Sequence, residues 1–418
     1  MRIRFSWVLA LTALVSTAAL VACSAKYSST SNGLVVISTQ NSAVMDMFSL
    51  DLGNGHMSQI FDSAGPPTNG VPTTVVLAPG GAYAYVLVTQ SVDVNASETG
   101  VETFSISSDG KLAPVGTTKL NAIGSTPVTP SAMVIDSAGK FLFVADSTPA
   151  TSVPGSVSVL AIGGSGGLSE VAGSPFALAS EPGGTTPSAS ALAVSPTVYP
   201  PAYSVCSGNT PPSTENLYVT DSTNYYVVNY AVGSSGALTL VRAAAVPGAA
   251  GYALTPATNQ TGVTVDPCNR FVYVANGQPS NNVSAFTICN TVTLPTCPTA
   301  NFSLLPISGS PFTAGPGPIA LQVDPLGNYL YVLDQQENAI RPYGIGTATG
   351  SLTPLNPTYS GSNQFPTSMA IRSDDTWMFV TNLNSASLSE YAITPSTGAL
   401  TTQPPIQTDN NPWGVAVR

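Results

Sequence analysis

Charged residues are scarce in this sequence. Only 8% of its 418 residues are Asp, Glu, Lys or Arg, against roughly 25% in average soluble proteins. Lys and Arg together number 11 against 21 Asp and Glu, so the formal net charge is −10. Such a field repels phosphate-rich partners, and no segment carries a basic patch. We therefore expect no nucleic-acid partner.

Histidine is almost missing. The only one, His56, lies in LGNGHMSQI, which we interpret as an outer hairpin. The chain therefore lacks the base of a Ser-His-Asp triad and the ligands of a two-His metal site. Residues 163–167, GGSGG, match G-x-S-x-G, but no strand-to-helix elbow surrounds them, so we interpret them as a hairpin turn.

No segment has a helical hydrophobic period long enough to predict an α-helix. Glycine and proline are abundant instead, at 37 and 36 residues, and 43% of the chain is hydrophobic. This composition permits a large core and is typical of short strands joined by many turns.

One strand pattern recurs along the chain and closes on Asp or Asn each time. It reads FLFVADS at 141–147, LYVTDS at 217–222, FVYVANG at 271–277, YLYVLDQ at 329–335 and MFVTNL at 378–383. Around it lies a repeating unit of four strand-like runs, and six full units span 72–115, 130–176, 187–241, 262–312, 318–355 and 366–403.

The two ends of the chain supply a seventh unit. Residues 34–60 read as a unit that lacks its first strand, and residues 412–418 read as a first strand alone. We therefore predict an all-β, seven-bladed β-propeller with four-stranded antiparallel blades, closed by pairing of the C-terminal strand with the N-terminal blade. A β-solenoid is the rival fold, but its repeats are shorter and need end caps instead of a split blade.

These motifs carry a family resemblance. FVYVAN, LYVTD and MFVTN resemble the YVTN-type repeat, and their combination with V-x-x-Y-x-I and G-x-L resembles the seven-bladed lactonase-like propellers. That group includes 6-phosphogluconolactonase-like and carboxymuconate cyclase-like proteins. The resemblance covers nearly all of the chain after residue 33 and implies a lactonase activity. No catalytic residue is transferred from the family, because no matching motif is visible.

The N-terminus predicts export and lipid anchoring. Arg2 and Arg4 precede an apolar run that ends in Leu20-Val21-Ala22-Cys23, which resembles the lipobox of bacterial lipoproteins. We predict a signal peptide at 1–22, a lipidated Cys23 with a short polar tether at 23–33, and the propeller at 34–418. The protein is then expected in the cell envelope, at the outer membrane, touching lipid only through its anchor. An ordinary signal peptide or an N-terminal membrane helix is the alternative.

Four further cysteines, an even number in an exported chain, favour disulfides. Cys289 and Cys297 flank a short insertion, whereas Cys206 and Cys268 lie in matching turns of neighbouring units. We predict the pairs Cys206–Cys268 and Cys289–Cys297. A four-cysteine zinc site is the rival, but the spacings contain no C-x-x-C pair.

Candidate site residues gather where the repeated strand ends. They are Asp146, Asp221, Asn276, Asp334 and Asn382. Each one by itself is interpreted as a turn cap. Together they would form an arc that binds a ligand or Ca²⁺, the one cofactor considered; none is otherwise expected.

Two further residues are candidates for ligand binding. Arg341 is the best anion-binding residue, and an ion pair with Asp334 or Glu337 is its alternative role. Trp413 would stack on a sugar or lactone ring, and plugging of the closing blade is its alternative role.

Three functions remain open at this point. The first is a non-catalytic envelope propeller, expected to be a monomer, that binds a protein, a glycan or a small molecule on its channel face. The second is a lactonase that hydrolyses a sugar lactone, with or without a metal. The third is a purely structural envelope protein.

Overall fold

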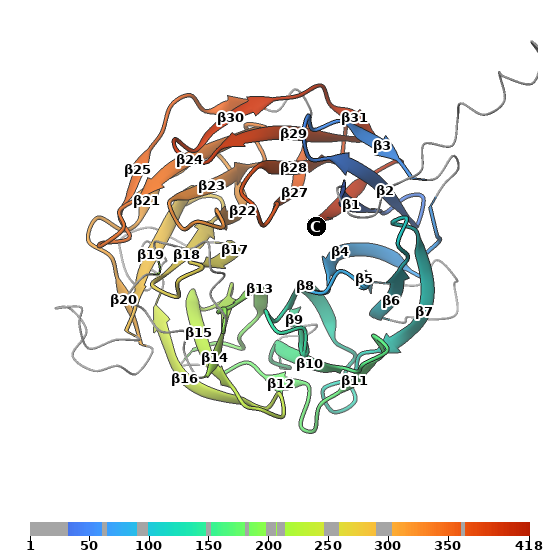
Figure 1. Cartoon of the computed structure of the whole chain (residues 1–418). Coiled ribbons are helices and arrows are strands. Elements are labelled where there is room, and N and C mark those ends of the chain that lie inside the picture. The colour runs from blue at the N-terminus through green and yellow to red at the C-terminus, as the bar shows by residue number, and fades with distance from the viewer. Residues whose placement is uncertain are drawn as a thin grey trace, which may run out of the picture.

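Seven antiparallel sheets surround a central axis in the computed structural model (Figure 1). The structure describes residues 32–60, 65–89, 99–147, 152–179, 184–197, 206, 214–245, 259–289, 303–360 and 364–418. Within these ranges there are β-strands and turns but no α-helix, and hence no helix able to cross a membrane. The predicted seven-bladed β-propeller is confirmed. The predicted signal peptide and Cys23 lie outside the described residues.

Each blade runs from an innermost strand at the axis to an outermost strand at the rim. Blade 1 contains β32 (Pro412–Val417), β1 (Asn32–Thr39), β2 (Val44–Asp51) and β3 (Met57–Gln59). Blade 2 contains β4 (Val71–Leu77), β5 (Tyr83–Thr89), β6 (Gly100–Ile106) and β7 (Leu112–Lys119). Blade 4 contains β13 (Ala189–Val194), β14 (Glu215–Asp221), β15 (Tyr226–Val232) and β16 (Leu238–Ala245).

In the other four blades the outermost strand is broken into two short pieces. Blade 3 contains β8 (Thr129–Ile135), β9 (Phe141–Ser147), β10 (Ser156–Ile162), β11 (Leu168–Glu170) and β12 (Phe176–Ala177). Blade 5 contains β17 (Gln260–Val265), β18 (Phe271–Asn276), β19 (Asn282–Ile288), β20 (Leu304–Pro306) and β21 (Phe312–Thr313). Blade 6 contains β22 (Pro318–Val323), β23 (Tyr329–Asp334), β24 (Ala339–Ile345), β25 (Leu352–Pro354) and β26 (Tyr359–Ser360). Blade 7 contains β27 (Pro366–Ile371), β28 (Trp377–Asn382), β29 (Ser387–Thr394), β30 (Ala399–Thr402) and β31 (Ile406–Gln407).

The repeated GSPF segments explain two of these breaks. Proline has no N–H to give to the ladder, so the outermost strand stops there and would leave an N–H of the third strand unpaired. The serine before the proline fills that place: the Val159 N–H donates to Ser174 Oγ in blade 3, and the Ala285 N–H donates to Ser310 Oγ in blade 5, both at 2.9 Å.

The core is a ring of seven hydrophobic clusters, one between each pair of adjacent blades. In β18 the side chains of Phe271, Tyr273 and Ala275 pack toward blade 6, whereas Val272 and Val274 pack toward blade 4. Because successive side chains of a strand point to opposite faces, a strand buried on both faces is apolar throughout. This explains the repeated strand pattern of the sequence.

Pairing of the two ends of the described chain closes the ring. Strand β32 lies antiparallel to β1, with Val35 opposite Val417 and Ile37 opposite Val415. The backbone N–H groups of Leu34 and Arg418 each donate to the other residue's carbonyl oxygen, at 3.2 and 3.0 Å. The predicted split blade is confirmed.

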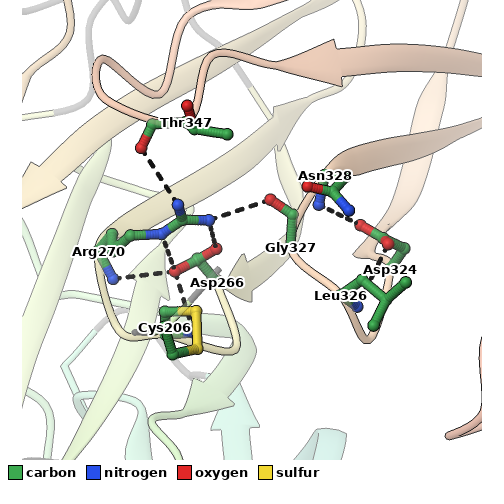
Figure 2. The surroundings of a disulfide bond; sticks show 9 residues. Cys206, Asp266, Arg270, Asp324, Leu326, Gly327, Asn328 and Thr347 are labelled. Carbon is green, nitrogen blue, oxygen red and sulfur yellow. Dashed lines mark hydrogen bonds and ion pairs between the residues drawn. A yellow bond between two sulfur atoms is a disulfide. The ribbon is translucent and has the colours of Figure 1, made fainter. Parts of the chain in front are cut away.

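A buried ion pair and a disulfide join the blades on the face opposite the ends of the second strands. The Arg270 guanidinium donates to both oxygens of buried Asp266, and it also donates to the Gly327 carbonyl of blade 6 at 3.0 Å (Figure 2). Beside this pair lies the disulfide between Cys206 and Cys268, whose Cα atoms are 5.2 Å apart (Figure 2). The predicted Cys206–Cys268 pairing is confirmed.

The second predicted pairing is described only on one side. Cys289 is disulfide-bonded, but Cys297 lies outside the described residues, so the pair Cys289–Cys297 stays a prediction.

The Cys206–Cys268 bridge closes a loop of 62 residues. A crosslink of that length removes about 4 kcal/mol of chain entropy from the unfolded state. We expect the double variant Cys206→Ser/Cys268→Ser to unfold at a clearly lower temperature in calorimetry. The matched double variant Cys289→Ser/Cys297→Ser opens a much shorter loop and should lose less. An equal loss in both variants would contradict the chain-entropy explanation.

The turn between β27 and β28 holds a carboxylate without a counter-charge. Asp375 is 1% exposed, and among the described residues neither of its carboxylate oxygens has a hydrogen-bond partner. Burial, and then the charge of Asp324, raise the pKa of Asp375 to about 7. Because the folded-state pKa lies above the unfolded value near 3.9, this group lowers stability progressively as the pH rises from about 4 to about 7.

We therefore expect Asp375→Asn to stabilise the protein by about 2–4 kcal/mol at pH 8 and to change little at pH 4. Asn also tolerates the left-handed backbone at this position, where φ is 59°. Thermal unfolding at both pH values measures the difference. The control is Asp374→Asn, which alters the neighbouring exposed carboxylate paired with Arg372. A gain of the same size at pH 4 would show that charge burial is not its source.

Candidate functional site

A cavity of about 580 Å³ lies at the centre of the ring. All seven innermost strands contribute to its wall, which explains why its residues are scattered through the sequence (Figure 1). The lining residues are Thr74, Val75, Ser131, Ser190, Asn259, Gln260, Thr261, Ile319, Gln335, Thr367, Ser368, Met369, Trp413, Gly414 and Val415. Not one of them is ionisable, so the wall is polar but uncharged.

A bulge near the start of each innermost strand shapes this wall. In every blade the pairing of the innermost strand with the second strand shifts register at this point. A bulge turns the side chain of the extra residue in a new direction. In three blades that residue is a Ser or Thr whose hydroxyl reaches the next blade. The bonds run from Ser131 Oγ to the Ala189 carbonyl, from Thr261 Oγ1 to the Pro318 carbonyl and from Thr367 Oγ1 to the Pro412 carbonyl.

These hydroxyl donors are therefore committed to holding neighbouring blades together. Other polar groups of the wall are not: within the described part of the chain, the side chains of Thr74, Asn259 and Ser368 make no hydrogen bond to protein atoms. Half-buried Trp413 supplies an aromatic face in the same wall. The cavity thus presents hydrogen-bonding groups and one aromatic ring, the surface expected for a small polar but uncharged ligand.

The five Asp and Asn residues at the ends of the second strands lie outside this wall. All five are at most 1% exposed. Asp146 Oδ2 accepts hydrogen bonds from Ser156 and Ser158, and Asn276 Nδ2 donates to Ser284. Asn382 Nδ2 donates to Ser389. In each case the partner is on the third strand of the same blade, so these side chains fasten the second strand to the third.

Asp221 and Asp334 have different partners. Asp221 accepts hydrogen bonds from backbone N–H groups that include those of Ser188 and Thr223, as a turn cap does. Asp334 pairs with Arg341 Nε at 2.7 Å. Burial raises the pKa of Asp146 and of Asp334 to about 7, in the latter case against the lowering effect of Arg341.

Asp146 borders only a narrow crevice between blade 3 and the loop around Val128, with no room for a water molecule. Its raised pKa reflects burial, and Asp146 is not among the residues that line the central cavity. Asp146 is therefore poorly placed to act on a ligand in the cavity.

Arg341 is engaged on both sides. Besides Asp334, its guanidinium contacts Glu337. With two carboxylates as partners it has no net positive charge to offer an anion, so the geometry favours the ion-pair role considered for it.

The remaining sequence motifs lie far from the cavity. His56 is exposed in the hairpin between β2 and β3, and its Nδ1 lies 2.9 Å from the Met57 carbonyl oxygen. Residues 163–167 form the turn between β10 and β11, where the Gly163 N–H donates to the Gly167 carbonyl. Among the described residues, no group of three or more His, Cys, Asp or Glu side chains is arranged to hold a metal ion.

Of the predicted site residues, Trp413 alone lines the central cavity. Thr74, Asn259, Gln335 and Ser368 were not singled out in the sequence. Their common signal is position: Thr74 and Ser368 lie at the bulge of an innermost strand, Asn259 directly precedes one, and Gln335 directly follows a second strand. The repeat alignment marks those positions, but the polar residue types there are too ordinary to attract notice.

Residues 266–413 match the model of the family described as "Lactonase, 7-bladed beta-propeller". The predicted resemblance to the lactonase-like seven-bladed propellers is thus confirmed. No curated protein sequence matches the chain significantly.

Solved structures resemble the whole propeller. A putative 6-phosphogluconolactonase from Bacteroides uniformis is 16% identical with a TM-score of 0.68, over 93% of this chain and 99% of that one. The periplasmic gluconolactonase PpgL of Pseudomonas aeruginosa is 17% identical with a TM-score of 0.65, over 93% and 99%. A Lactobacillus plantarum protein is 17% identical with a TM-score of 0.66, over the same shares. At such identities the likeness establishes the fold.

The partners of the five strand-end residues lead to a prediction about calcium. All five side chains are buried and each has a partner in its own blade, although Asp146 Oδ1, Asn276 Oδ1 and Asp334 Oδ1 accept no hydrogen bond from the described residues. Because these oxygens are closed off from solvent and do not converge, we expect neither added Ca²⁺ nor a chelator to change the melting temperature by more than about 1 °C. Thermal unfolding is measured once with about 5 mM calcium and once with about 5 mM chelator to check this. A calcium-dependent rise that Asp146→Ala or Asp334→Ala removes would restore the arc as a cation site.

Proposed function

We propose that this protein binds an uncharged sugar lactone in its central cavity and hydrolyses it. The observation that carries the proposal is the wall itself: free polar side chains and the Trp413 ring face a space of about 580 Å³ that holds no charged group among its lining residues. The lactonase family match and the lactonase names of two structural neighbours support a sugar lactone as the ligand; one of those names, gluconolactonase, is that of an enzyme for an unphosphorylated lactone.

The wall chemistry selects against a phosphorylated substrate. A phosphate group is normally met by Arg, Lys or a cluster of N–H donors. The cavity lining contains no Arg or Lys, and the chain carries a formal net charge of −10. An unphosphorylated lactone carries no charge to be compensated, and its hydroxyls match the free groups of Thr74, Asn259 and Ser368.

In the proposed reaction a water oxygen attacks the lactone carbonyl carbon, the ring C–O bond breaks, and a proton of that water passes to the ring oxygen, which gives the hydroxy acid. The residues of the cavity would orient the ring and donate hydrogen bonds to the carbonyl oxygen as negative charge develops on it. Trp413 would hold the apolar face of the ring.

A second function is binding without turnover. The observation that favours it is the same uncharged lining: none of the described lining residues has a side chain that titrates near neutral pH, so general acid–base catalysis has no donor there. In this case the cavity recognises the sugar ring and the propeller acts as a receptor in the envelope.

We also propose that the protein works outside the cytoplasm, on a lipid anchor at Cys23. The Cys206–Cys268 disulfide supports an oxidising compartment, and one structural neighbour is described as periplasmic.

The test is a hydrolysis assay with the purified protein on D-glucono-1,5-lactone and 6-phosphogluconolactone, corrected for the uncatalysed reaction. We expect kcat/KM for the unphosphorylated lactone to be at least about tenfold higher, since no cation in the wall meets a phosphate. Trp413→Ala should lower it about tenfold, and Trp413→Phe should retain most of it.

Three outcomes separate the possibilities. Turnover that depends on Trp413 supports hydrolysis. Binding of the lactone or of methyl β-D-glucoside with no turnover above background supports the receptor. Preferred turnover of the phosphorylated lactone would contradict the uncharged ligand, and absence of both binding and turnover would contradict the cavity as a sugar site.

A further inference from the structure

Phe365 occupies a position that the propeller repeats from blade to blade. It is the residue before the first pair of the innermost strand, and its carbonyl oxygen accepts a hydrogen bond from the N–H of Leu383, directly after the second strand, at 2.9 Å. The same bond occurs in four other blades. Its acceptors there are the carbonyl oxygens of Ser188, Asn259, Gly317 and Asn411.

This position is at the mouth of the central cavity. In blade 5 its residue, Asn259, is itself part of the cavity wall. In blade 7 the carbonyl of the next residue, Pro366, accepts a 2.9 Å hydrogen bond from the side chain of Gln335, which also lines the cavity. Phe365 therefore directly precedes a residue whose carbonyl is hydrogen-bonded to a side chain of the cavity wall.

The backbone at Phe365 is in the left-handed region, with φ of 61°. The equivalent residues Gly317 and Asn411 have φ of 68° and 58°. Glycine and asparagine adopt this conformation at little cost, whereas a bulky aromatic residue does so only with strain. In blades 1, 6 and 7 this position thus has a backbone that favours a small or polar residue, and blade 7 has a phenylalanine there.

Burial does not explain this choice. Phe365 is 39% exposed, one of only three exposed large hydrophobic residues in the described part of the chain. The other two, Val115 and Leu240, are on the outermost strands β7 and β16, away from the axis. Residues whose strained backbone is not compensated by burial of the side chain concentrate at functional sites.

A second aromatic residue lies on the neighbouring innermost strand. Thr367 Oγ1 donates to the carbonyl oxygens of Pro412 and Trp413, at 3.2 and 2.9 Å, which places β27 directly beside β32. Phe365, directly before β27, and Trp413, on the adjacent strand β32, are therefore on one side of the cavity, Trp413 in the wall and Phe365 next to it.

We infer that Phe365 is a ligand-binding residue: it forms an aromatic rim on the central site and packs on the apolar C–H face of an uncharged sugar ring next to Trp413. The inference rests on the proposed location of the sugar site, and it adds a subsite and a specificity. Ligands with a flat, apolar pyranose or lactone face are favoured over acyclic polyols, which offer an aromatic ring no such face.

The test replaces Phe365 by the residue of the neighbouring blade, Phe365→Asn, in the full-length protein. The matched control is Leu240→Asn, which removes another exposed large hydrophobic residue, on an outermost strand far from the axis. Calorimetry measures the Kd for methyl β-D-glucoside, a pyranose that is not hydrolysed, and the assay above measures KM for D-glucono-1,5-lactone. We expect Phe365→Asn to raise both constants roughly tenfold and Leu240→Asn to change neither.

A thermal scan excludes a merely structural role. Because the asparagine relieves the strained backbone, the melting temperature of Phe365→Asn should stay within about 2 °C of the wild type or rise. Unchanged Kd and KM in Phe365→Asn would overturn the inference, and a fall of more than about 5 °C with unchanged Kd would assign Phe365 to packing.

The outcomes also separate this inference from the proposed function. If Trp413→Ala weakens sugar binding and Phe365→Asn does not, the inference about Phe365 is wrong and the proposed function stands. If the glucoside binds, if Phe365→Asn weakens that binding and if no lactone is hydrolysed, then the proposed hydrolysis is wrong and the inference about Phe365 stands. A wild-type protein that binds neither probe would overturn both.

Discussion

The structure depends on the pairing of β32 with β1. An open ring would leave two sheet edges with unpaired N–H and C=O groups, and the clusters between blades 7 and 1 would be exposed to water. The antiparallel register of β32 with β1 removes those edges, and the hydrophobic cluster between the two blades completes the core. Because every blade is buried by its two neighbours, closure of this one junction stabilises all seven.

Closure also determines where a ligand can bind. Seven innermost strands meet around the axis, each with a bulge near its start, and three of the six Ser and Thr hydroxyls in the cavity wall bind the next blade. Hydrogen bonds between neighbouring blades thus engage several of the polar side chains around the axis. The groups left over, together with the Trp413 ring, make the cavity uncharged, able to form hydrogen bonds and aromatic on one side.

The buried carboxylates do not line the cavity. Asp146 and Asp334 seemed in the sequence to be candidates for cation binding, yet both are buried against partners in their own blades. Their raised pKa values, like that of Asp375, come mainly from burial. Groups of this kind cost stability near neutral pH, and a raised pKa alone does not mark a catalytic base.

The sequence by itself determined the number of blades, the split of blade 1 between the two ends and the Cys206–Cys268 pair, because these follow from local features: alternating apolar strands, a repeat period and matching turns. The central site was decided only by tertiary structure. Asn259 and Phe365 occupy one equivalent position in blades 5 and 7, and periodicity cannot tell which repeated position faces the cavity. At a bulge the side-chain direction depends on the pairing across the strands, and that pairing exists only once the ring has closed.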